Sequence, residues 1–356
     1  MELADHKLSG VEHSFPALKD WSLREGIKAW NCLMARASNA TLYHREPWLE
    51  LLHKSYRFDI RVKGIEGEDG ELEAACVMAR SKNPFVRRWI ALPFSDQCPP
   101  LARSPQSLKR LIQALTAGAI KSEGFEIRGL EPPLPWQTVN CFSNWKLDMA
   151  RQLPAIERGL KTNFRNNVRR AKRNSLSLSR NCDLDHLERF YALQIEARRR
   201  RGLPVQPRRF FLDLHDAFGS RDQLEVWLIS QGSRDVAGAV LICEQNTIHY
   251  KWAARLLSAP AGANHLLLWS VIEEYAGRVE VLDLGRADIR NQGLNRFKHE
   301  LGGLPYRVTY AFLPKAPAEI SPEVLTGSQR ILAQIWRRLP IRATRTLSAA
   351  IYGYLG

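Results

Sequence analysis

The chain has 356 residues, of which 45% are hydrophobic, with a formal net charge of +15 and an isoelectric point near 9.8. This length is typical of about two domains, and the hydrophobic content argues against extensive disorder. The excess of positive charge favours an anionic partner, such as a nucleotide-type cofactor, tRNA or an anionic lipid surface.

The six cysteines are scattered, without the CxxC or Cys/His spacing of a zinc site, so we expect neither a metal nor a disulfide framework. The N-terminal segment has no apolar signal-peptide core, and no apolar run reaches the ~20 residues of a membrane span. We therefore predict reduced thiols and a cytoplasmic protein that contacts the inner membrane at most peripherally.

The first half of the chain mixes helical and strand patterns. Helical spacing of apolar residues predicts helices over Asp20–Ala37, Arg45–His53 and Gln106–Glu123. Alternation and β-forming residues predict strands over Phe58–Ile65, Glu71–Arg80, Arg87–Leu92, Phe125–Leu130 and Phe142–Met149. A loop with four prolines precedes the third helix.

The second half repeats this order of elements. The same patterns predict helices over Asp185–Arg201, Pro207–Ala217, 264–276 and Leu294–Gly303. They predict strands over Gln223–Ser230, Val236–Glu244, Asn246–Ala254, Val279–Leu284 and Tyr306–Phe312. The repeat predicts two copies of one α/β (α+β) fold, although many unrelated α/β domains share so general an order.

The turn between the strand ending at Ala254 and the following helix is a candidate anion site. It contains Pro260 and Gly262, and Asn264 stands where a helix N-cap is expected. Free N–H groups and the helix dipole at such a start favour an anion such as pyrophosphate. We predict that Arg255, Gly262, Ala263 and Asn264 bind the cofactor, while an ordinary strand-to-helix connection remains the alternative.

Between the two halves, Arg158–Arg180 carries eight basic residues and no acidic one. On a helix, one stripe at i, i+4 spacing would contain Lys161, Arg165, Arg169 and Arg173, where like charges repel. Phosphates of a substrate or cofactor would relieve that repulsion. A solvated basic face is the competing interpretation.

The C-terminal tail, from Arg330 to Gly356, has five arginines and no acidic residue. It carries apolar residues at helical spacing: Ile331, Leu332, Ile335, Trp336 and Leu339. A basic amphipathic helix can lie on an anionic membrane, or it can pack its apolar face on the protein. We expect packing on the protein.

Several of these motifs resemble a known family. Lys161–Ser175 resembles the basic linker helix of the FemAB-like acyltransferases, and Leu282–Gly303 resembles their closing segment, with an Asp-bearing strand, an aromatic–Lys pair and a glycine stop. The helix after Gly262 is similar to their donor-side helix, and the likeness extends over residues 155–312. The resemblance implies two tandem GNAT-like domains, with mixed central sheets flanked by helices.

On this basis we expect an N-terminal domain over residues 1–150, a second domain over 151–315 beginning with a basic linker helix at 158–174, and a helical tail over 316–356. The family implies transfer of an acyl or aminoacyl group to an amine. The donor would be acyl-CoA (acetyl-CoA) or aminoacyl-tRNA, and the acceptor an amine-bearing cell-wall or polysaccharide precursor. One branch consists of peptidoglycan-bridge peptidyltransferases and another of GNAT-type N-acetyltransferases, and the sequence leaves the choice open.

The resemblance also points to catalytic residues. An amine that attacks an ester or thioester creates an oxyanion, which a positive donor stabilises. Lys298 matches the Lys of the aromatic–Lys pair, with Phe297 as the substrate-binding aromatic residue beside it. A surface lysine on a short helix would look the same.

Candidates for the group that removes the amine proton are less distinct, because no His/Asp dyad is visible in the sequence. The possible bases are Asp283, Asp288 and His299. His249 and Tyr250 point to opposite faces of one strand, so only one of them can face the site, and we favour Tyr250. Water or the substrate itself could instead act as the base.

Two non-enzymatic functions are alternatives to acyl transfer. The net charge of +15 suits a non-enzymatic nucleic-acid-binding protein, whose affinity would fall steeply with salt. No helix-turn-helix, RNP-like or zinc signature supports it. The basic tail suits a scaffold on an anionic membrane.

Overall fold

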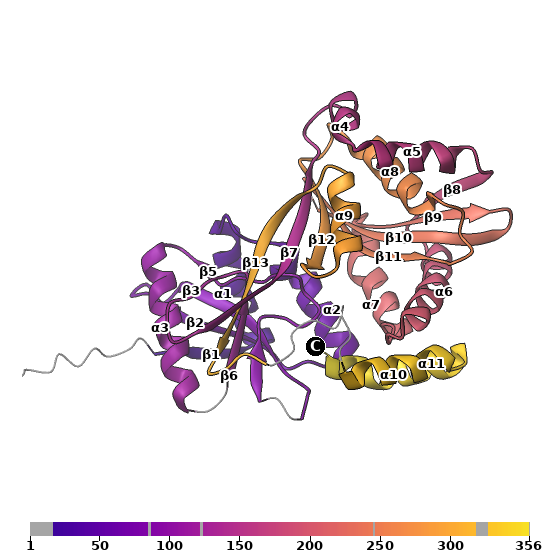
Figure 1. The fold of residues 1–356 in the computed structure, drawn as a ribbon. Helices are drawn as coiled ribbons and strands as arrows, with labels where there is room; N and C mark the ends of the chain where they lie inside the picture. The colour runs from indigo at the N-terminus through magenta and orange to yellow at the C-terminus, as the bar shows by residue number, and fades with distance from the viewer. Residues whose placement is uncertain (1–16, 85–86, 122–123, 245, 318–326, 356) are drawn as a thin grey trace, which may run out of the picture.

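The computed structural model describes residues 17–84, 87–121, 124–244, 246–317 and 327–355. One thirteen-stranded mixed sheet runs through it in the order β1-β2-β3-β4-β6-β13-β7-β12-β11-β10-β9-β8, with β5 paired to β3. Helices flank the sheet in two bodies, which lie side by side in Figure 1. The predicted α/β class with a mixed sheet flanked by helices is confirmed.

The first body is built from the N-terminal half. Its helices are α1 (Leu23–Arg36), α2 (Glu46–Tyr56) and α3 (Pro105–Lys121), with a 3-10 turn η1 (Leu42–His44). Its strands are β1 (Lys19–Ser22), β2 (Ile60–Glu66), β3 (Leu72–Arg80), β4 (Arg88–Ile90), β5 (Leu101–Ala102) and β6 (Gly124–Arg128). Trp30, Trp48 and Phe58 are fully buried in its core, so the predicted helices and strands form one apolar interior.

The second body follows β7 (Gln137–Asp148). Its helices are α4 (Leu153–Gly159), α5 (Thr162–Lys172), α6 (Leu184–Arg201), α7 (Arg208–Phe218), α8 (Ala263–Tyr275) and α9 (Gln292–Glu300), with a 3-10 turn η2 (Gly219–Arg221). Its strands are β8 (Leu176–Asn181), β9 (Leu224–Gln231), β10 (Arg234–Glu244), β11 (Thr247–Arg255), β12 (Val281–Asp288) and β13 (Leu304–Leu313). The strand β8, which pairs with β9, is absent from the sequence prediction.

Two strands link the bodies by exchanging places in the sheet. β13, from the end of the second body, pairs antiparallel with β6 of the first. β7, from the end of the first, pairs with β12 of the second, and β7 and β13 also pair with each other. Figure 1 shows both strands crossing from one body to the other. The division at residue 150 stays a prediction, and the hydrogen bonds of the sheet cross it.

The turn before α8 differs from its prediction in one respect. The N-cap is Gly262, with φ of +89°, and α8 begins at Ala263, so the assignment of Asn264 as N-cap is wrong. A Cβ added at Gly262 would lie only 2.2 Å from the carbonyl oxygen of Asn167 on α5. Glycine is required here by both the left-handed conformation and the close approach of α5.

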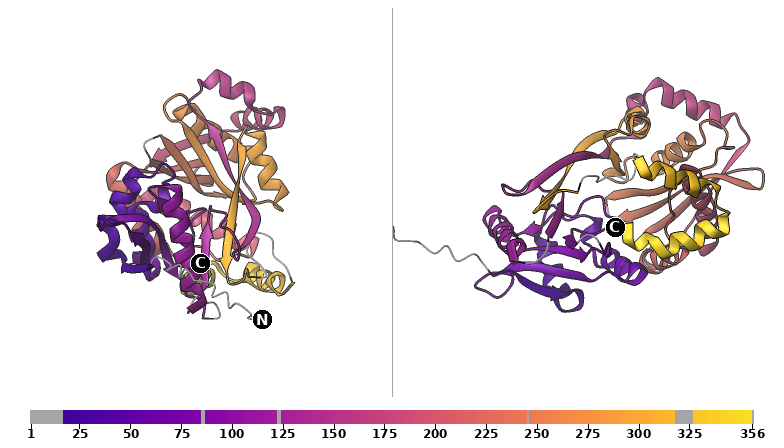
Figure 2. Two further views of the ribbon diagram at one scale, coloured as in Figure 1. Left: turned by 90° about the vertical axis from the view of Figure 1, so that its left-hand side faces the viewer. Right: turned by 60° about the horizontal axis from the view of Figure 1, so that its bottom comes forward.

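The described part of the tail forms α10 (Gly327–Arg338), α11 (Ile341–Ile351) and a 3-10 turn η3 (Tyr352–Leu355), which lie against α6. Figure 2 shows these helices along one side of the second body. Ile331, Leu332 and Ile335 are 62%, 65% and 56% exposed, whereas Trp336 and Leu339 are half-buried, so only part of this apolar face packs on the protein as expected. None of the described helices combines the length and apolarity needed to cross a bilayer.

Candidate functional site

The strands β11 and β12 part from each other in the middle of the sheet. They run parallel and pair only from Thr247 with Val281 to His249 with Asp283. The register of β12 with β7 breaks between Asp283 and Arg286, at Gly285 with φ of +72°. The edges that face each other beyond this point are therefore not joined by strand pairing, and a substrate's polar groups can bond there.

A buried charged cluster lies where the two strands part. His249 Nε2 lies 3.3 Å from Glu244 Oε2, and His249 Nδ1 lies 3.4 Å from Asp283 Oδ2. Burial alone would lower the pKa of His249, but the two carboxylates outweigh burial and raise it. Burial would raise the pKa of Asp283, and contact with His249 lowers it instead. The two carboxylates therefore favour the protonated form of the imidazole.

Asn144, on β7, completes this cluster from the opposite side. Its amide Nδ2 donates to Asp283 Oδ2 at 3.4 Å, while its Oδ1 is buried and has no hydrogen-bond partner among the described residues. Asn144 is only 2% exposed. A buried acceptor without a partner is uncommon in folded proteins and is suited to an N–H group of a ligand.

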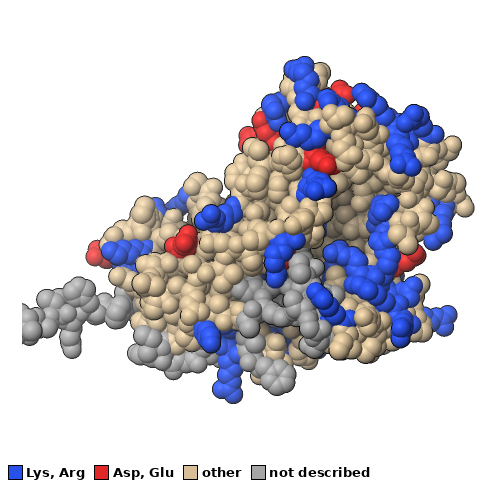
Figure 3. All heavy atoms as spheres, viewed as in Figure 1, with Lys and Arg blue, Asp and Glu red and all other residues tan. Residues whose placement is uncertain are grey.

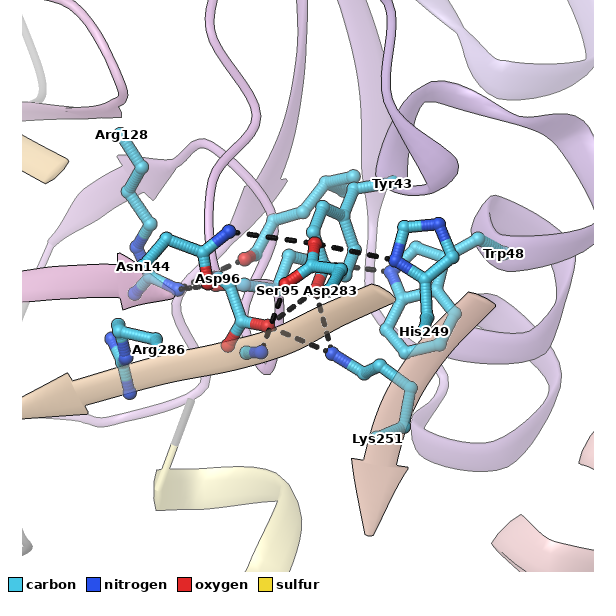
Figure 4. Close-up of polar contacts among 12 residues, drawn as sticks. Tyr43, Trp48, Ser95, Asp96, Arg128, Asn144, His249, Lys251, Asp283 and Arg286 are labelled. Atoms are coloured by element: carbon cyan, nitrogen blue, oxygen red, sulfur yellow. Dashed lines mark hydrogen bonds and ion pairs between the residues drawn. The ribbon is translucent and has the colours of Figure 1, made fainter. Parts of the chain in front are cut away.

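A second charged cluster joins the two bodies beside the first. Tyr43 donates to Asp96 Oδ2 at 2.5 Å, and Lys251 Nζ lies 2.6 Å from the Tyr43 hydroxyl and 3.1 Å from Asp96 Oδ2. Tyr43 and Asp96 come from the first body and Lys251 from β11 of the second (Figure 4). Burial would raise the pKa of Asp96, but Lys251 and Arg286 lower it well below its usual range. Asp96 is therefore an ionised carboxylate.

The loop that carries Asp96 is held in an unusual backbone conformation. Leu92 and Phe94 have φ of +54° and +61°, which bulky side chains rarely adopt. Arg128 donates to the carbonyls of Leu92 and Ser95, and Trp48 donates to Ser95 Oγ. Such strain persists where surrounding contacts over-determine it, and it clusters at functional sites. The N-terminal body thus presents Asp96 in a fixed position.

The position of Lys251 depends on a bulge in β11. Tyr250 pairs with Leu241 and Trp252 with Val240, so Lys251 is the extra residue of the strand. Its ammonium lies 5.3 Å from the Trp48 ring centroid, and its side chain is only 7% exposed. A bulge re-aims a side chain, and here it aims a lysine at Asp96.

The three predicted catalytic residues lie in different surroundings. Lys298 is buried, and its ammonium donates to the carbonyls of Gly285 at 2.8 Å and Arg286 at 3.2 Å, at the bulge of β12. Asp283 lies in the His249 cluster. Tyr250 packs in the apolar core of the second body, and burial raises its pKa.

The residues predicted to bind cofactor or substrate gather around the start of α8. Gly262 and Ala263 are buried beside α5, Asn264 is half-buried, and Arg255 donates to the carbonyl of Ala259 at 3.4 Å. Phe297 does not pack beside Lys298. Its ring contacts Phe164 of α5 and His265 of α8, with centroids 6.0 and 5.1 Å away.

The basic stripe Lys161, Arg165 and Arg169 lies on α5. Lys161 and Arg169 are exposed and Arg165 is half-buried. No acidic side chain in the described ranges forms an ion pair with any of the three. Figure 3 shows Lys and Arg along the top of the second body, where α5 lies, and around a hollow at the level of α9 and β11.

Sequence reasoning missed several residues of the site. Tyr43, Asp96 and Asn144 come from segments that the sequence prediction left without a function, and Tyr250 was favoured over His249. A lysine inside the aromatic strand segment His249–Trp252 was a usable signal, because a charged residue between large apolar neighbours needs a buried partner.

Residues 159–299 match the family model described as an acetyltransferase (GNAT) domain. Residues 159–299 therefore form a GNAT domain, which confirms the resemblance to GNAT acyltransferases over this stretch. The FemAB-like resemblance is matched by a shared fold. No curated protein sequence matches the chain.

Solved structures share the fold over nearly their whole length. FemX is 13% identical with a TM-score of 0.59, covering 80% of this chain and 95% of FemX. L-PGS from Bacillus licheniformis is 13% identical with a TM-score of 0.53, covering 88% and 97%. A tandem GNAT protein from the clavulanic acid biosynthesis pathway is 12% identical with a TM-score of 0.53, covering 85% and 100%. The chain thus has the tandem GNAT fold.

Proposed function

Because the chain carries a GNAT domain, we propose that it is an N-acyltransferase whose reaction takes place where β11 and β12 part. The observation that carries the proposal is the meeting of buried charged groups from both bodies at that point, with Asp96 and Tyr43 from one and Lys251, His249 and Asp283 from the other. Perturbed ionisable groups of this kind cluster at active sites.

The reaction forms one bond and breaks another. The acceptor nitrogen attacks the acyl carbon, a C–N bond forms, and the bond from that carbon to the donor's sulfur or oxygen breaks. The amine proton passes to the leaving group. The protein must therefore hold the amine, stabilise the oxyanion and provide a path for the proton.

We assign the acceptor amine to the space between Asp96 and Asn144. The ionised Asp96 carboxylate is 18% exposed, against 7% for Lys251, so it can also meet a substrate group. An amine N–H can donate to Asn144 Oδ1, which has no partner in the described structure. His249 in its neutral form, held 3.4 Å from Asp283 and beside Asn144, is the proposed proton acceptor.

We propose that the Lys298 ammonium donates a hydrogen bond to the oxyanion. Its bonds to the carbonyls of Gly285 and Arg286 also support a positioning role, because they fix the bulge that parts β12 from β11. Lys298→Met should lower kcat with little change in KM if the ammonium meets the oxyanion. A rise in KM with unchanged kcat would instead support positioning alone.

The donor is proposed to be an acyl-CoA, with aminoacyl-tRNA as the second candidate. Both carry phosphates that suit the basic stripe of α5, which has no acidic partner in the described ranges. The acceptor is proposed to be an amine of a cell-wall or polysaccharide precursor.

Calorimetric titration of the full chain with acetyl-CoA and with aminoacyl-tRNA would separate the donors. We expect acetyl-CoA to bind, and Arg165→Gln/Arg169→Gln to weaken its binding about tenfold or more. Arg278→Gln/Arg337→Gln, which removes two exposed arginines on other elements, is the matched control. The acyltransferase proposal fails if neither donor binds.

A further inference from the structure

The tail is attached to the protein by small and polar groups of α10 and α11 and by one aromatic ring of η3. Its buried residues are Ala333 of α10, Thr344 and Ser348 of α11, and Tyr352 of η3. Ala333 lies directly on the glycine that ends α6, because a Cβ added at Gly202 would be 2.6 Å from the Ala333 Cβ. Ser348 Oγ accepts from the backbone N–H of Val205 at 3.1 Å.

Three large apolar residues of α10 are turned away from this attachment, while Trp336 is half-buried. Ile331, Leu332 and Ile335 follow helical spacing on one face, and Ala333 contacts α6 from another. A helix that packs on its own protein normally buries its large apolar side chains. In α10, Ile331, Leu332 and Ile335 are instead exposed.

Apolar exposure is concentrated in this part of the molecule. Among the described residues, eight of the fifteen exposed large hydrophobic side chains lie in the tail: Ile331, Leu332, Ile335, Ile341, Leu347, Ile351, Tyr354 and Leu355. Exposed apolar side chains gathered in one segment in this way are typical of a docking surface.

The positive charge of the tail indicates which kind of partner this surface binds. Arg337, Arg338, Arg342 and Arg345 are exposed, and the sequence from Arg330 onwards contains no acidic residue. A second copy of the chain is disfavoured, because a two-fold contact would bring the same arginines together. Arginines beside exposed Ile and Leu suit the headgroups and acyl boundary of an anionic bilayer.

We propose that the surface formed by α10, α11 and η3, which we call the tail surface, docks on an anionic lipid bilayer. The tail also reaches the candidate site. The ring of Tyr352 in η3 lies 5.0 Å from that of Phe94, two residues before Asp96. Docking therefore brings the loop that carries Asp96 close to the membrane.

Vesicle flotation with the full chain tests the proposal without any need for activity. We expect binding to phosphatidylcholine vesicles that contain phosphatidylglycerol, little binding to phosphatidylcholine alone, and loss of binding as NaCl rises from about 0.1 to 0.5 M. Ile331→Ser/Leu332→Ser/Ile335→Ser should weaken binding about tenfold or more. Arg337→Gln/Arg338→Gln/Arg342→Gln should weaken it by about 100-fold.

The matched control is Leu134→Ser/Leu178→Ser/Leu184→Ser, which removes three exposed leucines outside the tail and should leave binding unchanged. Thermal melts verify that each variant is folded. Absence of binding by the wild-type chain, or equal binding to both vesicle types, would overturn the proposal. So would self-association of the wild-type chain that the Ile331/Leu332/Ile335 variant abolishes, since the surface would then join two copies.

Discussion

At the residue scale, this protein is defined by charged groups that are buried in compensating pairs. Asp96 meets Lys251, and His249 meets Asp283 and Glu244, all at the junction of the two bodies. A buried charge without a partner costs several kcal/mol, so each member depends on its partner for stability. Asp96 and Lys251, which are proposed for acyl transfer, therefore also hold the two bodies together.

The pair Asp96 and Lys251 should show strong coupling in a double-mutant cycle. Asp96→Asn removes the carboxylate that contacts the buried Lys251, and Lys251→Met removes the ammonium that contacts Asp96 and leaves Arg286 nearby, so each should lower the free energy of unfolding by about 3 kcal/mol. The double variant should be less destabilised than the sum of the two by about 2 kcal/mol. Urea denaturation measures all three, and additive effects would contradict a direct charge pair.

The stabilising effect of His249 should depend on pH. Its pKa is raised in the folded state, so the contribution is complete below about 6.5, its unfolded value, and is lost as pH rises through the folded pKa. The pKa values of Asp283 and Glu244 are lowered, so their contribution falls away below about pH 4.

His249→Gln should therefore destabilise the protein on the order of 1 kcal/mol more at pH 6 than at pH 9. Urea denaturation of the wild type and the variant at both pH values provides the comparison. A difference that stays constant with pH would mean that folding does not change the pKa of the imidazole.

At the element scale, the packing of α5 on the start of α8 shapes the region predicted to hold the cofactor. Gly262 lies directly under the backbone of Asn167, and Phe164, His265 and Phe297 join α5, α8 and α9 through their rings. The basic stripe of α5 is thereby fixed beside the helix start whose N–H groups were predicted to meet an anion.

Gly262→Ala measures how tightly α5 is fixed. The new methyl group would lie 2.2 Å from Asn167 O at a φ of +89°, so α5 must shift. Gly232→Ala is the control, because it has a φ of +60° and nothing within 4 Å. We expect a loss of about 1 kcal/mol in the free energy of unfolding for Gly232→Ala and about 2 kcal/mol more for Gly262→Ala. Equal losses would show that the contact with α5 adjusts freely.

At the scale of the whole molecule, the exchange of β7 and β13 makes the two bodies one folding unit. β7 separates β12 from β13, so residues 151–356 alone would expose both strand edges. Exposed edges with an apolar face promote aggregation.

A fragment of residues 151–356 should therefore be aggregated, whereas residues 131–356, which retain β7, should be more soluble and more folded. Size-exclusion chromatography and circular dichroism compare the two. A monomeric, fully folded 151–356 fragment would contradict the dependence on β7.

The sequence by itself determined the elements of this protein. Periodicity predicted most helices and strands to within a few residues, because apolar spacing and turn residues are local properties. The GNAT resemblance was carried by contiguous motifs in 155–312, and the family match confirms it over residues 159–299.

Only the tertiary structure decided which elements meet. Asp96 and Lys251 lie far apart in the sequence, and neither the bulge at Lys251 nor the strained loop at Leu92 and Phe94 has a local signature. Whether the apolar face of α10 is exposed or buried also depends on tertiary contacts. Its amphipathic pattern is the same whether the apolar side meets protein or solvent, and the outcome is set by the contact of Ala333 with the end of α6.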